Sequence, residues 1–452
     1  MVKKYLSSYW IRSAFYTVLQ RFSITLFGLI NFIVLIRSLS KAQMGSWALF
    51  LVVTSIFEIT KSGLLKNAHI RYVSSSTDKE DKAAIASSSL LINASISAIF
   101  ITLILVFSDH VSVWLHTGQE LATMLKWFIP GLIAMVFYSH LEAIQQSHLD
   151  FKGVFAGGFV RQVLFFLMIA GHMVLHKPYS VRLLALYQSI AIIIGTIIIY
   201  LYSRPYILHR FNPSKRWTKQ IFNYGGYIFS SGIISNLVTN LDQVMTARFM
   251  PDASSVAYYN AASRINQLID IPSFAAAEVI FPKVSMASTA EGPEKVRYLF
   301  ERMVAVLLCF TAPTALLIIL FPNLVIQIIA GSKYAAAAPI LRLYMVTGIL
   351  RPMQHQAANL LNSIGKSGLC FYLNTGSLLV NLLLNYIFFS YIGFYGAALG
   401  TLATFILGAF VWYKVMNREI GMKLSTIGTY MIVQYKTIFT NVLGLISQKK
   451  AS

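Results

Sequence analysis

Three arginines lie inside apolar stretches of this sequence that are long enough to cross a membrane. They are Arg21, Arg264 and Arg351. An arginine at the centre of an inserted helix costs about 2.5–3.5 kcal/mol, which packing alone does not repay. A water-filled cavity with cationic walls would explain all three and would attract an anionic substrate. The sequence therefore predicts binding of an anion at membrane depth.

Other polar residues recur at helical spacing beside these arginines and in two further stretches. Residues three or four apart share one face of a helix. The candidates for lining the cavity or binding a coupling ion are Asp242, Asp270, Glu142, His355, Asn240, Gln267 and Asn359. The carboxylates could be a coupling-ion site or counter-ions to the arginines, and each amide could instead join two helices. We expect no metal site and no cofactor, only coupling to an H⁺ or Na⁺ gradient.

The composition places these stretches in a lipid bilayer. Of the 452 residues, 56% are hydrophobic and 12% are charged, whereas a soluble protein carries about 25% charged residues. The net charge of +21 does not indicate a nucleic-acid partner, because the basic residues lie between apolar segments. We expect membrane lipids to surround the chain.

Apolar segments of about 20 residues, the length that crosses a bilayer, recur twelve times, and the fold predicted is all-α. The segments are 14–36, 44–65, 85–107, 121–146, 154–175, 181–203, 222–247, 256–281, 299–321, 338–362, 369–391 and 394–416. Lysine and arginine concentrate in every second connector, where we also count Lys152 and Arg161. This asymmetry predicts that both termini lie in the cytoplasm.

The chain divides into two halves with a basic connector between them. We predict a six-helix lobe over 1–203, a cytoplasmic linker over 204–220 and a second six-helix lobe over 221–416. The run RSLSKA at 37–42 resembles RFMPDA at 248–253, which favours an internal repeat. The remaining residues, 417–452, form a cytoplasmic tail, in which 427–446 fit an amphipathic helix at the membrane surface.

Four runs of sequence resemble one known family. They are SGLLKNAHIRYVS at 62–74, NLDQV at 240–244 with VAYYNAASR at 256–264, VIFPKV at 279–284, and GSKYAAAAPILR at 331–342. With them, nearly the whole chain resembles the bacterial polysaccharide flippases, the Wzx-type members of the multidrug/oligosaccharidyl-lipid/polysaccharide exporter superfamily. The resemblance implies two lobes in a V, as in the MATE transporters of that superfamily, that alternate between inward-open and outward-open states.

The resemblance also implies a substrate and a location. The substrate is a lipid-linked oligosaccharide on undecaprenyl pyrophosphate, moved across the bacterial inner membrane for surface polysaccharide synthesis such as O-antigen, capsule or exopolysaccharide. Implied partners are a polysaccharide polymerase and a chain-length regulator. A cationic lumen for the pyrophosphate matches Arg21, Arg264 and Arg351.

Three other functions are compatible with parts of the pattern. A multidrug or cation antiporter of the same superfamily predicts an acidic lumen. A lipid II flippase is expected to carry two further helices. A membrane glycan polymerase or ligase, which is an enzyme, needs a large external loop, whereas the connectors here are short. We therefore expect a transporter and no enzyme.

Overall fold

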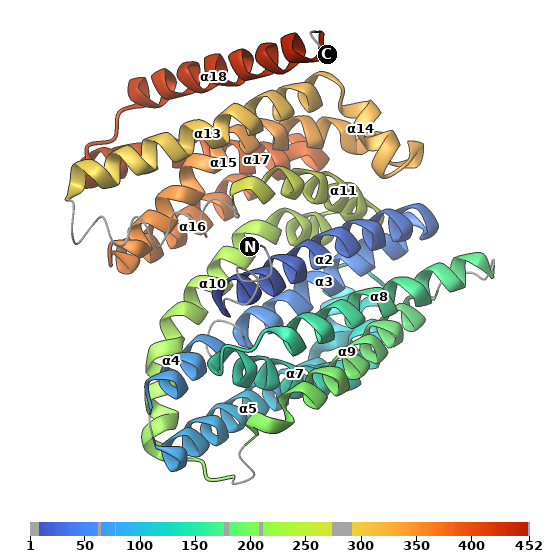
Figure 1. Ribbon diagram of the computed structural model, residues 1–452. Helices are drawn as coiled ribbons and strands as arrows, with labels where there is room; N and C mark the ends of the chain where they lie inside the picture. Colours follow the sequence, from blue (N-terminus) through green and yellow to red (C-terminus); the bar gives the residue numbers. More distant parts are fainter. Residues whose placement is uncertain are drawn as a thin grey trace. The chain divides into compact units, whose positions relative to one another are not determined.

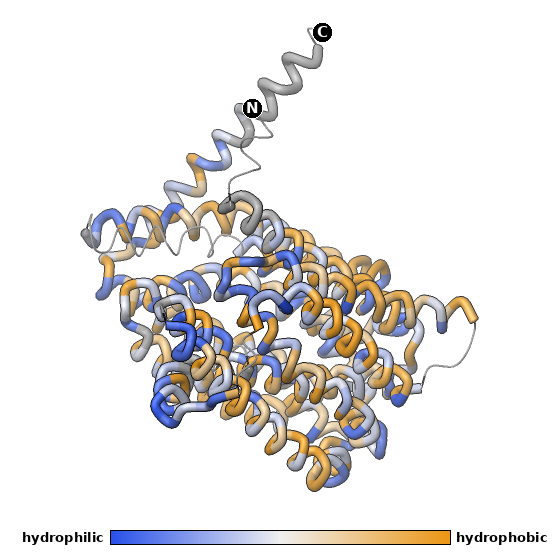
Figure 2. Tube along the Cα trace, turned by 60° about the horizontal axis from the view of Figure 1, so that its bottom comes forward, coloured by the Kyte–Doolittle hydropathy of each residue, from blue (hydrophilic) through white to orange (hydrophobic). Residues whose placement is uncertain are grey.

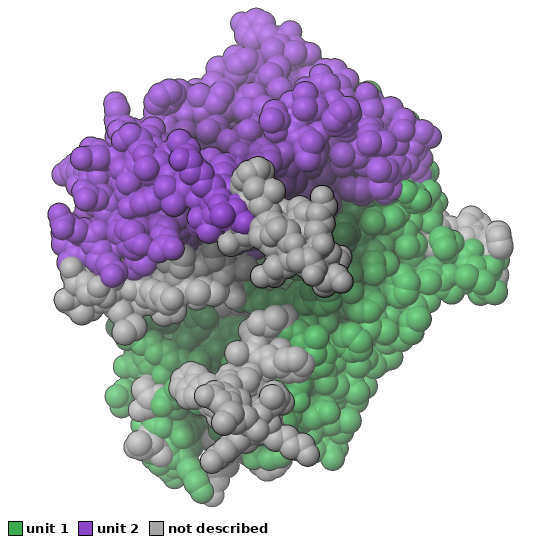
Figure 3. All heavy atoms as spheres, turned by 45° about the horizontal axis from the view of Figure 1, so that its top comes forward, with its two compact units in different colours: residues 1–257 green, residues 258–452 purple. Residues whose placement is uncertain are grey.

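The computed structural model describes residues 9–61, 65–76, 78–175, 180–207, 211–273 and 292–450. The regular elements in these ranges are α-helices and short 3-10 helices, with a π turn at Leu65 and Lys66. The contacts between residues divide the chain into unit 1, Met1–Ala257, and unit 2, Tyr258–Ser452, coloured separately in Figure 3. The expected lobes, 1–203 and 221–416, and their arrangement in a V stay predictions.

Unit 1 is a bundle in which helices distant in sequence pack side by side. α8 packs on α2 and α9, α7 packs on α9, and α10 packs on α3, α4 and α5 (Figure 1). Its helices are α2 (Tyr9–Ser38), α3 (Lys41–Lys61), α4 (Asn67–Ser75), α5 (Lys79–Trp114), α6 (Glu120–Trp127), α7 (Ile129–Ser147), α8 (Lys152–Val174), α9 (Val181–Ser203), the short η2 (Arg204–Tyr206) and α10 (Lys215–Phe249).

Unit 2 is a second helical bundle with its own core. α15 packs on α13 and α17, and α16 packs on α17, around buried residues that include Phe300, Val304, Trp412 and Met416. The helices of this part are α11 (Ser254–Ile269), which begins at the end of unit 1, then α13 (Pro293–Leu320), α14 (Pro322–Ile329), α15 (Ala338–Ser363), α16 (Ser367–Ile392), α17 (Gly396–Ile420) and α18 (Leu424–Lys450).

The all-α membrane fold predicted from the sequence is confirmed. Each of the twelve expected segments overlaps helix in the structure, although 274–281 at the end of the eighth lies outside the described residues. Among those residues, seven stretches are long and apolar enough to span a membrane, or up to eight with one bent pair. One of the seven, Gly368–Ile420, contains both α16 and α17. Figure 2 shows hydrophilic residues interrupting the apolar helices.

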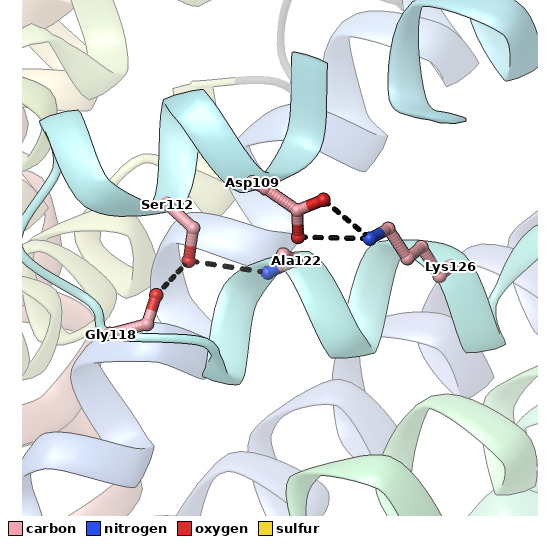
Figure 4. Close-up of polar contacts among 5 residues, drawn as sticks. All are labelled: Asp109, Ser112, Gly118, Ala122 and Lys126. Atoms are coloured by element: carbon pink, nitrogen blue, oxygen red, sulfur yellow. Dashed lines mark hydrogen bonds and ion pairs between the residues drawn. The ribbon is translucent and has the colours of Figure 1, made fainter. Parts of the chain in front are cut away.

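The fourth expected segment is broken rather than continuous. α6 and α7 meet at an angle of 46°, and Pro130 stands in the first turn of α7, where it has no N–H to give to the preceding turn. Lys126, expected within the membrane, lies in the last turn of α6 and pairs with Asp109 of α5 at 2.7 Å. Figure 4 shows this ion pair beside Ser112, which bonds across the α5–α6 turn.

Connectors that the charge pattern assigns to one side of the membrane lie at one end of unit 1. Ser74 Oγ donates to the carbonyl of Ser147 at 3.4 Å, and the Ser214 amide donates to Ser88 Oγ at 2.9 Å. At the other end, His116 Nδ1 lies 3.1 Å from the carbonyl of Ala247. The alternation of connectors and the cytoplasmic side of the membrane stay predictions, with which these contacts agree.

The tail helix α18 runs along α13 (Figure 1). Tyr435 Oη donates to the Cys309 carbonyl at 3.0 Å, and the Cys309 thiol donates to the Met431 carbonyl at 3.7 Å. Met431 also packs against the core of unit 2. Part of the apolar stripe predicted over 427–446 therefore faces α13, and its place at a membrane surface stays a prediction.

The second run of the suggested repeat, 248–253, ends against the start of α3 in unit 1. A Cβ added to Gly45, near the start of α3, would lie only 1.7 Å from the carbonyl oxygen of Ala253. Glycine is therefore required at this position, because any side chain forces one of the two backbones to move.

We expect Gly45→Ala to lower the amount of folded protein in the membrane, because overpacking of this kind costs about 1–3 kcal/mol. Gly28→Ala in α2 is the matched control, since nothing lies within 4 Å of the added Cβ. Membrane abundance and thermal unfolding in detergent measure the difference. Equal abundance and melting temperature for the two variants would contradict this account of the contact.

Candidate functional site

Arg351 is held on several sides inside unit 2. Its Nη1 donates to Asp270 Oδ2 at 2.7 Å, and the two side chains are only 14% and 6% exposed. With the amide of Asn266 turned so that its oxygen faces the guanidinium, that oxygen accepts from Nη1 and Nη2 at 3.1 and 3.2 Å. The guanidinium also lies 5.3 Å from the centre of the Phe405 ring. Arg351 therefore joins α15 to the end of α11.

Neighbouring polar residues of α15 add contacts between α15 and the residues at and after the end of α11. Gln356 Nε2 donates to the carbonyl of Ser273 at 2.8 Å, and Asn359 Nδ2 donates to Gln356 Oε1 at 3.4 Å. His355 lies within electrostatic range of both Asp270 and Arg351. The structure thus brings three predicted site residues together, namely Asp270, Arg351 and His355, and Asn359 follows on the next turn of α15.

Arg264 differs from Arg351 in its surroundings. It lies on α11 and is half-buried, yet the described residues give it no hydrogen-bond or ion-pair partner. The nearby Gln267 turns to Ser263, with Nε2 3.4 Å from Oγ. A half-buried cation without a protein partner must be satisfied by water or by an anion. Arg264 therefore stays a candidate for binding an anionic ligand.

The acidic candidate of unit 1 is also paired. Glu142 Oε1 on α7 accepts from Lys66 Nζ at 2.8 Å and from Gln146 Nε2 at 3.2 Å. The Glu142 and Lys66 side chains are 17% and 24% exposed. This contact fastens the connector between α3 and α4 to α7, so Glu142 has a structural role in unit 1.

The expectation that Arg161 lies in a connector is wrong. Arg161 lies inside α8, where its Nη2 donates to Glu58 Oε1 of α3 at 3.0 Å and its guanidinium lies 5.9 Å from the ring centre of Tyr138. Charges within a membrane bundle need such partners. Arg161 lies within the apolar run 159–169. That position indicates a spanning helix, but the count of charges assigned Arg161 to a connector.

The remaining candidates lie on two other helices of unit 1. Arg21 on α2 is exposed, and Asp242 on α10 is buried. Asn240 Nδ2 donates to the carbonyl of Asn236 at 3.0 Å, and Asn236 in turn donates to Ser55 of α3 at 3.0 Å. The stripe on α10 therefore helps to hold α10 against α3. Convergence of the three arginines on one cavity stays a prediction, because Arg21 belongs to unit 1 and the other two belong to unit 2.

Comparison with known proteins adds information on ancestry. The probable low-salt glycan biosynthesis flippase Agl15 of Haloferax volcanii is 24% identical over 213 residues, which cover 47% of this chain and 45% of that protein. The lipopolysaccharide biosynthesis protein WzxC of Escherichia coli K12 is 24% identical over 204 residues, covering 44% and 40% of the two chains. The matches thus span less than half of each of these relatives.

Solved structures of similar fold match over almost the whole chain. The lipid II flippase MurJ, in an inward closed conformation, superposes with a TM-score of 0.75 at 16% identity, covering 95% of this chain and 93% of that one. An outward-facing multidrug resistance transporter of the MATE family superposes with a TM-score of 0.64 at 16% identity, covering 91% and 95%. At such identity these likenesses establish the fold alone.

A family model described as "Polysaccharide biosynthesis protein" matches residues 34–339. The match includes α3 to α11, with Arg264 and Asp270, and ends at the start of α15. The resemblance seen in the sequence is therefore confirmed at the level of the family. This chain belongs to the polysaccharide biosynthesis protein family and has the all-helical membrane fold shared by MurJ and the MATE transporters.

Proposed function

We propose that this protein is a flippase that moves a lipid-linked oligosaccharide across the membrane by alternating access. The observation that carries the proposal is the contrast between Arg264 and Arg351 in unit 2. Asp270 neutralises Arg351 at 2.7 Å, whereas the described residues leave Arg264 unpaired. One available guanidinium suits a phosphate group, which it can bind through two parallel hydrogen bonds.

The finer parts of the proposal follow the family. The carrier is undecaprenyl pyrophosphate, the membrane is the bacterial inner membrane with both termini in the cytoplasm, and the product supplies surface polysaccharide synthesis. A polymerase and a chain-length regulator are the proposed partners. Names of relatives that refer to glycan, lipopolysaccharide and teichuronic acid synthesis support this direction.

A cation antiporter is the second candidate, and the pairing of the acids argues against it. A site for cationic drugs needs a carboxylate that is available to the ligand. Asp270 pairs with Arg351, and Glu142 pairs with Lys66. If transport is coupled to H⁺ or Na⁺, we propose that Asp242 takes part, because Asp270 is held by Arg351.

Arg264→Ala should lower glycan export at least tenfold while membrane abundance stays normal, because the variant removes an anion contact and no structural pair. Arg264→Lys should restore export only in part, since the charge returns without the planar fork of donors. Export is measured by complementation of a strain that lacks its own flippase, with abundance measured by immunoblot.

Lys414→Ala is the matched control, because Lys414 is an exposed cation on α17 of the same unit. It should export like the unaltered protein. Normal export by Arg264→Ala, or equal loss in Arg264→Ala and Lys414→Ala, would contradict a binding role for Arg264.

Asp270→Asn should reduce the amount of folded protein, because it leaves a buried guanidinium without its charge partner, and breaking such a pair costs about 3–5 kcal/mol. The double variant Asp270→Asn/Arg351→Gln should restore abundance, since neither charge is then buried alone. Thermal unfolding in detergent reports both effects. Unchanged stability in Asp270→Asn would show that the pair does not hold α11 to α15.

A further inference from the structure

Unit 1 contains a cavity of about 510 Å³ that none of the predicted site residues lines. It lies among α4, α5, α7, α9 and the residues after η2. These four helices lie together in the lower part of Figure 1. Its volume is within the range of about 300–1,000 Å³ found for pockets that bind small ligands.

The walls of the cavity are apolar and continue onto the outer surface of unit 1. Phe137 of α7 and Ile197 and Tyr200 of α9 line the cavity, and they are 51%, 52% and 43% exposed. Neighbours on the same two helices, Ile133 and Leu201, are also exposed at 49% and 48%. Apolar side chains exposed in this number on spanning helices face lipid, so the cavity is open to the hydrocarbon of the bilayer.

Several polar residues of the lining lie at one end of the cavity. α5 starts at this end, which places Lys82 in its first turns, and α7 ends here, with Ser147 and His148. Lys82 is the one lysine or arginine of the cavity lining. Asp81, next to Lys82 in the sequence, accepts from Trp217 Nε1 at 3.1 Å, and Asp150, two residues after His148, accepts from Tyr206 Oη at 3.2 Å.

Two imidazoles of the lining have unused hydrogen-bonding capacity. His69 of α4 is only 1% exposed, and its ring lies edge-on to that of His140 of α7 with the ring centres 5.6 Å apart. Neither Nδ1 atom has a hydrogen-bond partner among the described residues. α4 lies outside the spanning segments, and burial, followed by the fields of His140 and His148, lowers the pKa of His69 well below its ordinary value. His69 is therefore neutral near pH 7, and its ring can offer a hydrogen bond.

We infer that this cavity binds one anionic phospholipid of the bilayer, with an acyl chain between α7 and α9 and the phosphate beside Lys82. An apolar chamber that opens to hydrocarbon and ends at a lysine and several imidazoles is complementary to a molecule with a hydrocarbon tail and an anionic head. Water alone fits it poorly, because a buried water needs two to four polar partners and the walls are largely apolar. The site lies within unit 1 and does not depend on the proposed flippase activity.

Native mass spectrometry of the full-length chain in detergent tests this site, with dioleoyl phosphatidylglycerol, dioleoyl phosphatidylcholine and dioleoylglycerol added separately. The unaltered protein should bind one phosphatidylglycerol in preference to the other two lipids. Ala86→Trp, which places an indole in the cavity, should weaken that binding at least tenfold. Ala86→Leu fills less space and should weaken it at least threefold, which keeps the test valid if the tryptophan variant fails to fold.

Lys82→Gln should abolish the preference for phosphatidylglycerol over dioleoylglycerol. The variant removes the cation that pairs with the phosphate and leaves the contacts with the acyl chain unchanged. Lys79→Gln, at an exposed position of the same helix, and Ile193→Trp, at an exposed position of α9 outside the lining, are the matched controls. Both should bind like the unaltered protein.

Three results would overturn the inference. The first is phosphatidylglycerol binding by folded Ala86→Leu equal to that of the unaltered protein. The second is an unchanged lipid preference in Lys82→Gln. The third is displacement of phosphatidylglycerol by an excess of inorganic phosphate, which would make the site one for a free anion.

Discussion

A charge inside a helical membrane bundle needs a partner or water, and this constraint determines which charged residues of the chain are structural. Continuum and experimental estimates agree that removing one member of a buried pair costs several kcal/mol. Asp270 and Arg351 meet this condition for the end of α11, at 2.7 Å. Without that pair, the polar stripe on α15 would place a guanidinium against apolar helix surface.

The same rule explains the long connections of unit 1. Lys66 and Glu142 bind the connector after α3 to α7, while Arg161 and Glu58 bind α8 to α3. These pairs join helices that are distant in sequence, so they select one packing arrangement among several that hydrophobicity alone would allow. Arg264 stands apart from them, since the described residues provide it with no counter-ion.

Hydropathy and charge were sufficient to predict the helices, because each span needs about 20 apolar residues whatever its neighbours are. The pairing of polar residues could not be predicted in this way. Spacing assigns Asp270 and Arg264 to one face of a helix. It does not predict that Asp270 pairs with Arg351 of another helix. Arg161 was misplaced for a related reason, since its charge suggested a connector while its partner, Glu58, is about a hundred positions away. Pro130 indicates the break before α7, but the mean hydropathy of the segment does not show it.

A transporter must bind its substrate strongly enough to select it and weakly enough to release it, and the pairing in unit 2 is suited to that balance. Two free guanidinium groups next to each other would hold a pyrophosphate tightly in every conformation, and a ligand that binds two states equally shifts neither. Asp270 neutralises Arg351 of α15, whereas Arg264 of α11 has no counter-ion among the described residues. For the proposed flippase, a single guanidinium holds the anion less tightly than two would, so a change in the groups around Arg264 has a larger relative effect on binding. The affinity of the site could therefore differ between conformations, which is the condition that alternating access requires.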